Sequence, residues 1–328
     1  MDKLFNPSKK FIKTTNLYKF QTYLEKKFSK KYVNYNKLWL WTNNNPGKFW
    51  ESIVEYFNID LEKKRSFKAY KKGNSFWNSK FFDNSNLNYY DLISRNNSSN
   101  LAIEFIGENK FSEKITYNDL NKRINALSNY YLDLGIKKGD VIVGYLPNIP
   151  DTIISFLSAA KIGAVWSSCS SEFGTQAVID RFSQLKPKLL IIADHYFHNG
   201  KKFNYSKNYR ILKTKLNNPI VLKTNYPSKY NTSKFKKIFN QKKYLKFNKH
   251  VSLSFNHPLY VLFSSGTTGL PKCITHGHGG SLLQHVKELA LHTNVKSKDK
   301  MLFLTTCGWM MWNWTVSNLL LGSSIVLY

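Results

Sequence analysis

Residues 139–194 alternate short apolar runs with stretches of helical length, and this alternation constrains the fold more than any other feature of the sequence. Three runs, GDVIVGYLP, AVWSSCS and KLLIIAD, have the length and apolar character of buried strands. The segments between them, Ile149–Ile162 and Gly174–Leu185, are long enough to cross back over a sheet as helices. Strands that alternate with such helices form a parallel sheet covered on both faces. The sequence therefore predicts an α/β fold with parallel sheets flanked by helices.

The segments on either side of this region extend the prediction. Leu101–Glu108 and Glu113–Tyr117 are expected to pair as a hairpin. Thr116 is a suitable N-cap for a helix over Asn118–Leu134. Residues 195–250 show no clear periodicity apart from PIVLK, so we expect a surface excursion there.

The N-terminal part of the chain is basic and then aromatic. Residues 1–34 are rich in lysine, which predicts a surface helix or a loose arm. In residues 38–59, bulky rings precede a helical pattern of apolar residues, as in a segment that docks against a larger body. The rings are Trp39, Trp41, Phe49 and Trp50, and the pattern is Ile53, Val54 and Phe57.

Another apolar run, Leu259–Phe263, gives way to the polar loop Ser264–Pro271 and resumes at Lys272–Thr275. The first run predicts a buried strand, and the second predicts the strand that returns beside it. Glycines in such a loop let consecutive N–H groups turn toward an anion. The glycines are Gly266 and Gly269, and the polar side chains are Ser264, Ser265, Thr267, Thr268 and Lys272. Because hydroxyl donors and a compact cation suit phosphate oxygens, the loop predicts phosphate binding.

The loop also has other interpretations. A P-loop NTPase needs Gly-Lys followed by Ser or Thr, whereas Lys272 stands between Pro271 and Cys273. The run HGHGG is not a dinucleotide fingerprint, because Leu282 stands three residues after Gly279. A Ser/Gly/Thr loop between strands is also a common hairpin turn that binds no ligand.

The charge is strongly unbalanced, with 49 Lys plus Arg against 20 Asp plus Glu. Abundant Asn, Ile, Phe and Tyr accompany the lysines, as expected for an AT-rich genome, so much of the excess is interpreted as a solvated basic surface. No acidic residue lies between Asp194 and Glu288, while lysine recurs through 201–249. This local positive field would suit nucleic acid or a ligand with several phosphates. Because no nucleic-acid-recognition motif accompanies it, a basic nucleic-acid-binding protein is kept only as an alternative.

Several other classes of site are not predicted. Three widely spaced cysteines indicate neither a disulfide framework nor a zinc site. His276 and His278 have no carboxylate near them in the sequence and are interpreted as loop residues, so no metal ligand is predicted. Polar residues divide the uncharged segment 301–328 into strand, helix and strand, which argues against a membrane span. The N-terminus lacks the apolar run of a signal peptide, so a cytoplasmic location is expected.

Residues 264–272, SSGTTGLPK, resemble the phosphate loop of the adenylate-forming (AMP-binding) superfamily of acyl-CoA synthetases. The resemblance implies that Ser264–Gly269 and Lys272 contact the pyrophosphate end of ATP, with Lys272 in a catalytic role. It departs at Cys273, where many relatives have glycine. Members of the superfamily use ATP and Mg²⁺ to form an acyl-adenylate and then transfer the acyl group to coenzyme A, so these are the implied cofactors.

Residues 305–314, TTCGWMMWNW, are similar to the aromatic motif that lines the acid pocket in the superfamily. The resemblance implies that Trp309, Met310 and Met311 lie near the acyl group, where adaptable methionine side chains would leave room for a small keto acid. A buried aromatic cluster without a ligand is the alternative.

Further likeness concerns the coenzyme. Residues 167–194 resemble the acetoacetate-activating branch of the superfamily. By analogy, the loop around Ser171 and Glu172 and the segment Asn199–Lys201 are expected near the coenzyme A phosphates, with Lys201 as a weak candidate for contact.

The N-terminal segments 38–59 and 81–93 resemble the extension of acetate- and acetoacetate-activating synthetases, although Tyr90-Asp91 depart from the acetoacetate pattern. The resemblance implies an extension over 1–95 and an AMP-binding domain over 96–328 that is incomplete, so that the fragment would be inactive alone. It implies an acid–thiol ligase for acetoacetate, with acetate or propionate as the alternative acid. The oligomeric state is left open.

Overall fold

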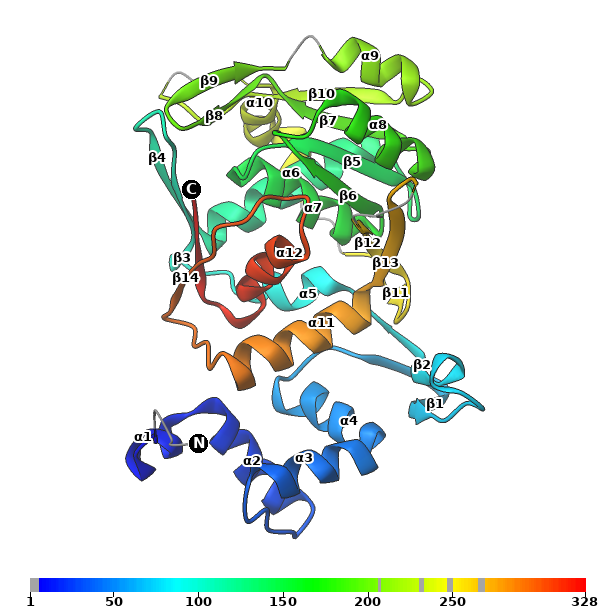
Figure 1. The fold of residues 1–328 in the computed structure, drawn as a ribbon, viewed down its shortest axis with the longest axis vertical. Coiled ribbons are helices and arrows are strands. Elements are labelled where there is room, and N and C mark those ends of the chain that lie inside the picture. Colours follow the sequence, from blue (N-terminus) through cyan, green and yellow to red (C-terminus); the bar gives the residue numbers. More distant parts are fainter. Residues whose placement is uncertain (1–5, 206–207, 230–232, 247–249, 265–268) are drawn as a thin grey trace.

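The computed structural model describes residues 6–205, 208–229, 233–246, 250–264 and 269–328. Figure 1 shows β-sheets and their helices in the upper part of the molecule and a group of N-terminal helices below them. A long helix, α11 (His278–Lys287), runs between the two parts. The molecule therefore has an upper α/β body and a lower helical extension that meet along α11.

The larger sheet has six strands within the described residues, in the order β10-β7-β5-β6-β12-β13. All neighbours are parallel except β12 and β13. The strands are β5 (Val141–Leu146), β6 (Val165–Ser170), β7 (Leu189–Ala193), β10 (Ile220–Thr224), β12 (Pro258–Ser264) and β13 (Lys272–Gly277). The predicted α/β fold is confirmed, and so is the strand that returns beside β12.

Helices cover both faces of this sheet. Helix α7 (Pro150–Ile162) connects β5 to β6, and α8 (Thr175–Phe182) connects β6 back across β5 to β7. Right-handed crossovers that move in opposite directions place their helices on opposite faces. Every residue of α7 is buried, and α6 (Tyr117–Asp133) packs against it. Helix α6 begins as predicted, because the Asp119 N–H donates to Thr116 Oγ1 at 3.1 Å.

A smaller sheet pairs strands from the beginning and from the end of residues 101–328. Its strand order is β14-β15-β3-β4. The strands are β3 (Leu101–Ile106), β4 (Ser112–Thr116), β14 (Lys300–Leu302) and β15 (Ser324–Leu327). The predicted hairpin is β3–β4. Helix α12 (Met310–Val316) and a 3₁₀ turn (Ser317–Leu321) lie between β14 and β15, which confirms strand–helix–strand for residues 301–328. Among the described helices, none has the length and apolar character needed to span a bilayer.

The prediction of a surface excursion over 195–250 is wrong in part. PIVLK forms β10, which pairs in parallel with β7 and extends the larger sheet. The other elements are β8 (His195–His198), β9 (Lys201–Asn204), α9 (Asn208–Lys215), α10 (Lys234–Asn240) and a 3₁₀ turn (Lys242–Tyr244). Leu212, Leu222 and Phe235 are buried, so sparse apolar residues anchor this segment despite its many lysines.

The N-terminal residues form helices and a small sheet. The elements are α1 (Lys9–Thr14), α2 (Asn16–Lys27), α3 (Tyr35–Asn44), α4 (Pro46–Tyr56), β1 (Glu62–Lys71), a 3₁₀ turn (Phe76–Asn78), β2 (Lys80–Leu87), α5 (Tyr89–Ser94) and β11 (Leu253–Ser254). The Asn16 side chain donates to the carbonyls of Ala290 and Val295, which ties α2 to the α/β body. Trp41 is buried as expected, but Trp39 is 51% exposed, so the prediction that Trp39 is an anchor is wrong.

His276 and His278 are not loop residues. His276 lies on β13 and stacks on Tyr260, whereas His278 begins α11 and is fully buried. The Tyr89 N–H donates to His278 Nδ1 at 3.2 Å. Burial lowers the pKa of His278 to about 3, so its ring is neutral at pH 7.

Acid should destabilise this fold through His278 and a second buried histidine, His285. Burial lowers the pKa of His285 to about 4, and its Nδ1 lies 2.6 Å from Ser317 Oγ. These two histidines bind protons from about pH 6.5 downward in the unfolded chain and stay neutral in the folded chain, so the stability that they contribute is lost as the pH falls. Between pH 7 and 5, we expect each histidine to cost about 2 kcal/mol. Urea unfolding at both pH values tests this.

The variant His285→Gln removes one of the two titrating groups. Its free energy of unfolding should fall by about 2 kcal/mol less than that of the wild type over the same pH interval. Equal losses in the two proteins would contradict this explanation of the acid sensitivity.

Candidate active site

The carboxyl ends of three adjacent strands meet at one edge of the larger sheet. Leu146, the last residue of β5, is the register partner of Ser170, the last residue of β6. Tyr260 of β12 is the register partner of Trp166 of β6. Extending this register by four residues aligns Ser264 with Ser170. Open α/β sheets bind ligands at this edge, so the polar residues that follow these strands form the candidate site.

The predicted phosphate loop begins and ends at this edge. Ser264 and Lys272 are register partners at the mouth of the loop. Ser265, Gly266, Thr267 and Thr268 lie outside the described residues, so their predicted phosphate contacts remain predictions. Gly269 has φ +96°, a conformation that favours glycine.

Gln184 holds the second half of the loop. Its side-chain amide donates to the Pro271 carbonyl at 3.0 Å, and the Cys273 thiol donates to the Gln184 side-chain oxygen at 3.5 Å. Gln184 belongs to the 3₁₀ turn after α8, Ser183–Leu185. The loop stem is therefore fixed to the helix layer of the sheet just before Lys272.

Lys272 carries an exposed charge at the loop mouth. In the described part of the chain, no carboxylate forms an ion pair with its Nζ. An exposed ammonium without an internal counter-ion is available to an anionic ligand. This position agrees with the predicted role of Lys272 in phosphate binding but does not test it.

An open cavity of about 660 Å³ lies along the ends of β5 and β6. Residues from seven separate segments line it: Glu108, Pro147–Asn148, Ser170–Glu172, Tyr196–Gly200, Tyr226, Leu304–Thr306 and Tyr328. The cavity brings Ser171 and Glu172 together with Asn199 and Gly200, the grouping expected around coenzyme A. Lys201 follows Gly200 on β9 and is exposed, but it does not line the cavity.

Hydrogen bonds fix the turn before α12 against this edge. The Cys307 thiol donates to the Leu146 carbonyl at 3.1 Å, and the Ser168 hydroxyl donates to the Cys307 carbonyl at 2.6 Å. A Cβ at Gly308 would lie 3.4 Å from the Ser170 nitrogen, so the turn passes close to β6. The Thr306 hydroxyl is buried and has no partner among the described residues, so it is a polar group available to a ligand in the cavity.

Two tyrosines, Tyr145 and Tyr205, form hydrogen bonds with the loop that follows β6. Tyr145 donates its hydroxyl to the Phe173 carbonyl at 2.6 Å, and burial raises the pKa of Tyr145 to about 12. The hydroxyls of Ser171 and Tyr205 lie 3.2 Å apart. Ser170 donates to the Glu172 carboxylate. These bonds position the cavity wall while leaving the Glu172 side chain exposed to solvent.

Helix α12 carries the residues predicted for the acid pocket. Trp309 is 53% exposed, Met310 is 37% exposed and Met311 is half-buried. None of the three lines the cavity at the strand ends, so their contact with an acyl group remains a prediction. Trp312, the next residue, is buried, and its indole N–H donates to Asn148 Oδ1 at 3.0 Å.

The sequence analysis missed Asn148, Thr306 and Gln184. Asn148 follows a buried strand by two residues, and polar residues at that position are a recognisable signal in a parallel sheet. Thr306 stands in the aromatic motif but was not singled out. Gln184 carries no sequence signal, because its contact with Pro271 joins residues 87 apart.

Within the described ranges, no three His, Cys, Asp or Glu residues form a group that could hold a metal ion. Two carboxylates, Glu108 and Glu172, line the cavity; Glu108 accepts from the Gly200 N–H and Glu172 accepts from the Ser170 hydroxyl. No step is therefore assigned to Mg²⁺ from the residues present.

Comparisons with known proteins place the chain in a family. Residues 95–328 match the family described as "AMP-binding enzyme". The chain is 35% identical over 335 residues to "Acetoacetyl-coenzyme A synthetase" of Rhizobium meliloti (strain 1021), covering 99% of this chain and 51% of the relative. It is 36% identical over 313 residues to "Acetoacetyl-CoA synthetase" of Gallus gallus, covering 90% and 46%.

A solved structure is similar over the whole chain. "Acetoacetyl-CoA Synthetase from Streptomyces lividans" superposes with a TM-score of 0.90 at 30% identity, covering 100% of this chain and 51% of that one. The chain thus spans about half the length of the relatives it matches. The predicted likeness to adenylate-forming acyl-CoA synthetases, with acetoacetyl-CoA synthetases among the similar proteins, is confirmed.

Proposed function

The chain belongs to the AMP-binding enzyme family, and from this premise we propose that it supplies the phosphate-binding half of an acetoacetate–CoA ligase. The relatives that support this substrate are 35% and 36% identical and are named for acetoacetyl-CoA synthesis. One structural observation carries the proposal: Ser264 and Lys272 pair at the carboxyl end of β12, a strand that runs parallel to β6 beside β5. The domain division at residues 95 and 96 is part of the same proposal.

The reaction would join two anions. A carboxylate oxygen of acetoacetate attacks the α-phosphorus of ATP, the bond to the bridging oxygen breaks, and pyrophosphate leaves with those electrons. The coenzyme A sulfur, having lost its proton, then attacks the acyl carbon of the adenylate; the bond from that carbon to the AMP oxygen breaks, so AMP leaves with those electrons and the thioester is formed. Because both first reactants are negatively charged, the protein's main tasks are to position them and to neutralise phosphate charge.

The residues divide these tasks between them. Lys272 places a positive charge beside the departing pyrophosphate, and the hydroxyl of Ser264 donates to a phosphate oxygen. Gly269 lets the backbone turn around the phosphates. Mg²⁺, when bound with ATP, would supply further positive charge on the phosphates. Trp309, Met310 and Met311 would border the acyl group from the start of α12.

The acid is identified by pyrophosphate exchange. With the complete gene product, acetoacetate should support exchange between labelled pyrophosphate and ATP faster than acetate or propionate does. Faster exchange with acetate would assign the protein to the acetate-activating branch. No exchange with any of the three acids would refute an acyl-adenylate-forming activity on short acids.

The coenzyme would enter along the cavity at the ends of β5 and β6. Ser171, Asn199 and Gly200 line it, and Lys201, the first residue of β9, follows Gly200 directly. A positive charge at this position suits a coenzyme with several phosphates. Because ATP and coenzyme A are cytoplasmic metabolites, the proposal includes a cytoplasmic location.

Replacing Lys201 with glutamine should raise the KM for coenzyme A about threefold and leave kcat unchanged, because an exposed ion pair is worth about 0.2–1 kcal/mol. Lys202→Gln is the matched control, since its side chain leaves the other face of β9. Steady-state kinetics at low salt, with coenzyme A and with dephospho-coenzyme A, make the measurement. A KM that is unchanged in Lys201→Gln would remove this residue from the coenzyme site.

A further inference from the structure

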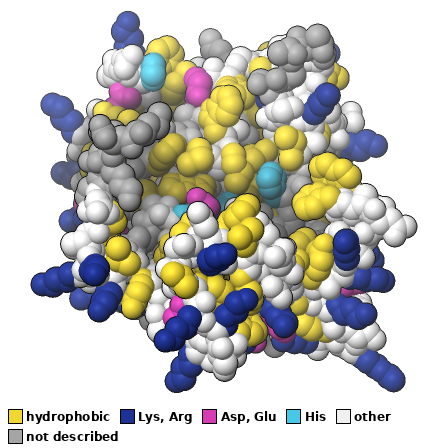
Figure 2. All heavy atoms as spheres, turned by 60° about the horizontal axis from the view of Figure 1, so that its bottom comes forward, with side chains coloured by type: hydrophobic (Ala, Val, Ile, Leu, Met, Phe, Trp, Pro, Cys, Tyr) yellow, Lys and Arg dark blue, Asp and Glu magenta, His cyan; other side chains and the backbone are white. Residues whose placement is uncertain are grey.

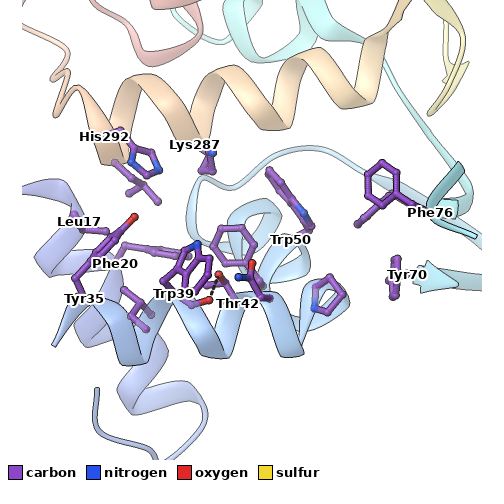
Figure 3. Close-up of a pocket in the computed structure, with 16 residues that line it drawn as sticks. Leu17, Phe20, Tyr35, Trp39, Thr42, Trp50, Tyr70, Phe76, Lys287 and His292 are labelled. Carbon is purple, nitrogen blue, oxygen red and sulfur yellow. Dashed lines mark hydrogen bonds between the residues drawn. The ribbon is translucent and has the colours of Figure 1, made fainter. Parts of the chain in front are cut away.

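A second cavity lies far from the strand ends, between α11 and the N-terminal helices. Its volume is about 520 Å³, within the range of small-molecule sites. The lining comes from α2, α3, α4, β1, the 3₁₀ turn after it, β2, and α11 with the turn that continues it. The lining residues are Leu17, Phe20, Tyr35, Leu38, Trp39, Thr42, Asn43, Pro46, Phe49, Trp50, Tyr70, Phe76, Phe81, Lys287, Leu291 and His292. Figure 3 shows this arrangement, with α11 above and the aromatic side chains below it.

The walls of this cavity are aromatic. Phe20 and Leu38 form a buried floor, while Trp39 is 51% exposed at the opening. The rings of Phe49 and Trp50 lie 5.0 Å apart at 60°, a packed edge of the wall. Flat aromatic walls bind flat or branched apolar groups by contact and by ring–ring interaction.

Lys287 gives the cavity its charge. The described lining contains Lys287 and His292 and no acidic side chain. The Lys287 side chain is 17% exposed, and its Nζ lies 3.6 Å from Glu288 Oε2, beyond ordinary hydrogen-bond length. In Figure 3, Lys287 and His292 lie at the lower side of α11 and its continuation, above the aromatic side chains. Figure 2 shows hydrophobic side chains gathered in the middle of one face with Lys and Arg around its edge.

The backbone at the cavity is also unusual. Residues Glu288–His292 form a π-helical turn directly after α11. Such turns are rare and occur frequently at functional sites. The turn contributes Leu291 and His292 to the lining, and burial lowers the pKa of His292, which favours its neutral ring.

The positive charge of Lys287 affects cationic, neutral and anionic ligands differently. A cationic ligand would meet the aromatic rings favourably but would be repelled by Lys287. A neutral apolar ligand would leave the charge of Lys287, a lining residue, with only the long contact to Glu288. A carboxylate would pair with Lys287 while its apolar body contacts the rings.

We propose that the cavity between α11 and the N-terminal helices binds a small aromatic or branched apolar carboxylate, with Lys287 as its counter-ion. The site is separate from the phosphate loop and does not depend on the ligase activity. Helix α11 follows β13, whose first residue is Lys272, so the two sites share one continuous segment of chain.

The test uses a matched pair of probes, 1-naphthaleneacetate and the neutral 1-naphthaleneethanol, titrated into the 328-residue chain by calorimetry. The acid should bind about tenfold more tightly than the alcohol, because a hydrogen-bonded charge adds to the same apolar contact. Lys287→Met should abolish this difference and leave alcohol binding unchanged. Lys298→Met, at an exposed lysine outside the cavity, should preserve it.

Two further variants localise the ligand. Trp39→Ala should weaken both probes, and because the ring is half exposed, the variant should fold normally. Lys272→Ala should leave both probes bound as in the wild type. Equal affinity for acid and alcohol in the wild type, or loss of binding in Lys272→Ala, would overturn the proposal. So would failure of both probes to bind while sedimentation shows a dimer that Trp39→Ala dissociates, since a second copy would then be the occupant.

Discussion

Replacing Lys272 with alanine should slow ATP–pyrophosphate exchange by the complete gene product about 10²–10³-fold while leaving its unfolding temperature unchanged. The rate should fall because a positioned donor aimed at developing phosphate charge contributes about this much to catalysis. Stability should not change, because the Lys272 side chain is exposed and forms no ion pair within the described residues. The measurement is exchange at saturating acetoacetate together with thermal unfolding.

Two controls separate charge from position. Lys272→Arg keeps the charge but not the compact ammonium, so it should recover only part of the rate. Lys298→Ala removes an exposed lysine away from the strand ends and should exchange at the wild-type rate. Wild-type exchange by Lys272→Ala would show that the loop lysine does not act on the phosphates.

Replacing Trp312 with alanine should lower the free energy of unfolding by about 3–5 kcal/mol. Trp312 is 1% exposed and packs near Phe156, with ring centres 5.9 Å apart. Its removal leaves a large hole between α12 and α7 and takes away the donor to Asn148 at the cavity edge. Urea unfolding at pH 7 gives the size of the effect.

Two other tryptophan variants serve as controls for Trp312→Ala. Trp312→Phe keeps most of the ring and loses the hydrogen bond to Asn148, so it should cost less than Trp312→Ala. Trp77 is 88% exposed, and Trp77→Ala should change stability by no more than about 0.5 kcal/mol. A cost for Trp312→Ala as small as that for Trp77→Ala would mean that α12 does not depend on this ring.

The sequence was most informative where burial is continuous. The apolar runs of β5, β6 and β7 and the helix-length segments between them predicted the larger sheet, because a strand buried on both faces has little freedom in composition. The same reasoning located β12 and the returning β13. It failed for β10, because that strand lies at the sheet edge and its Ile220 and Lys223 are exposed.

Aromatic residues were harder to place. Trp39 and Trp41 are two residues apart on one helix, yet the first is half exposed and the second is buried. Nothing in the sequence distinguishes the two rings. Trp41 is the buried one because it packs against Phe28 and Tyr32. Density of rings predicts a docked segment but not which ring contacts its neighbour.

The residues of the candidate site also differ in whether the sequence could predict them. The motif identified Ser264, Gly269 and Lys272 because consecutive residues of one loop carry the signal. Thr306 and Gln184 became candidates only in the fold, since Thr306 lines a cavity with residues of other segments and Gln184 bonds to the Pro271 carbonyl. Sequence alone cannot place such partners, because the contacts join positions that are far apart in the chain.

The central claim is that the loop closed by Ser264 and Lys272 holds the phosphates of ATP at the carboxyl ends of β5, β6 and β12. A crystal structure of the complete gene product grown with ATP and Mg²⁺ tests it most directly. The claim predicts a β- or γ-phosphate oxygen within hydrogen-bond distance of Lys272 Nζ and of the Ser264 hydroxyl. A triphosphate bound elsewhere, for example on the lysine-rich surface of residues 201–249, with the loop making no phosphate contact, would contradict it.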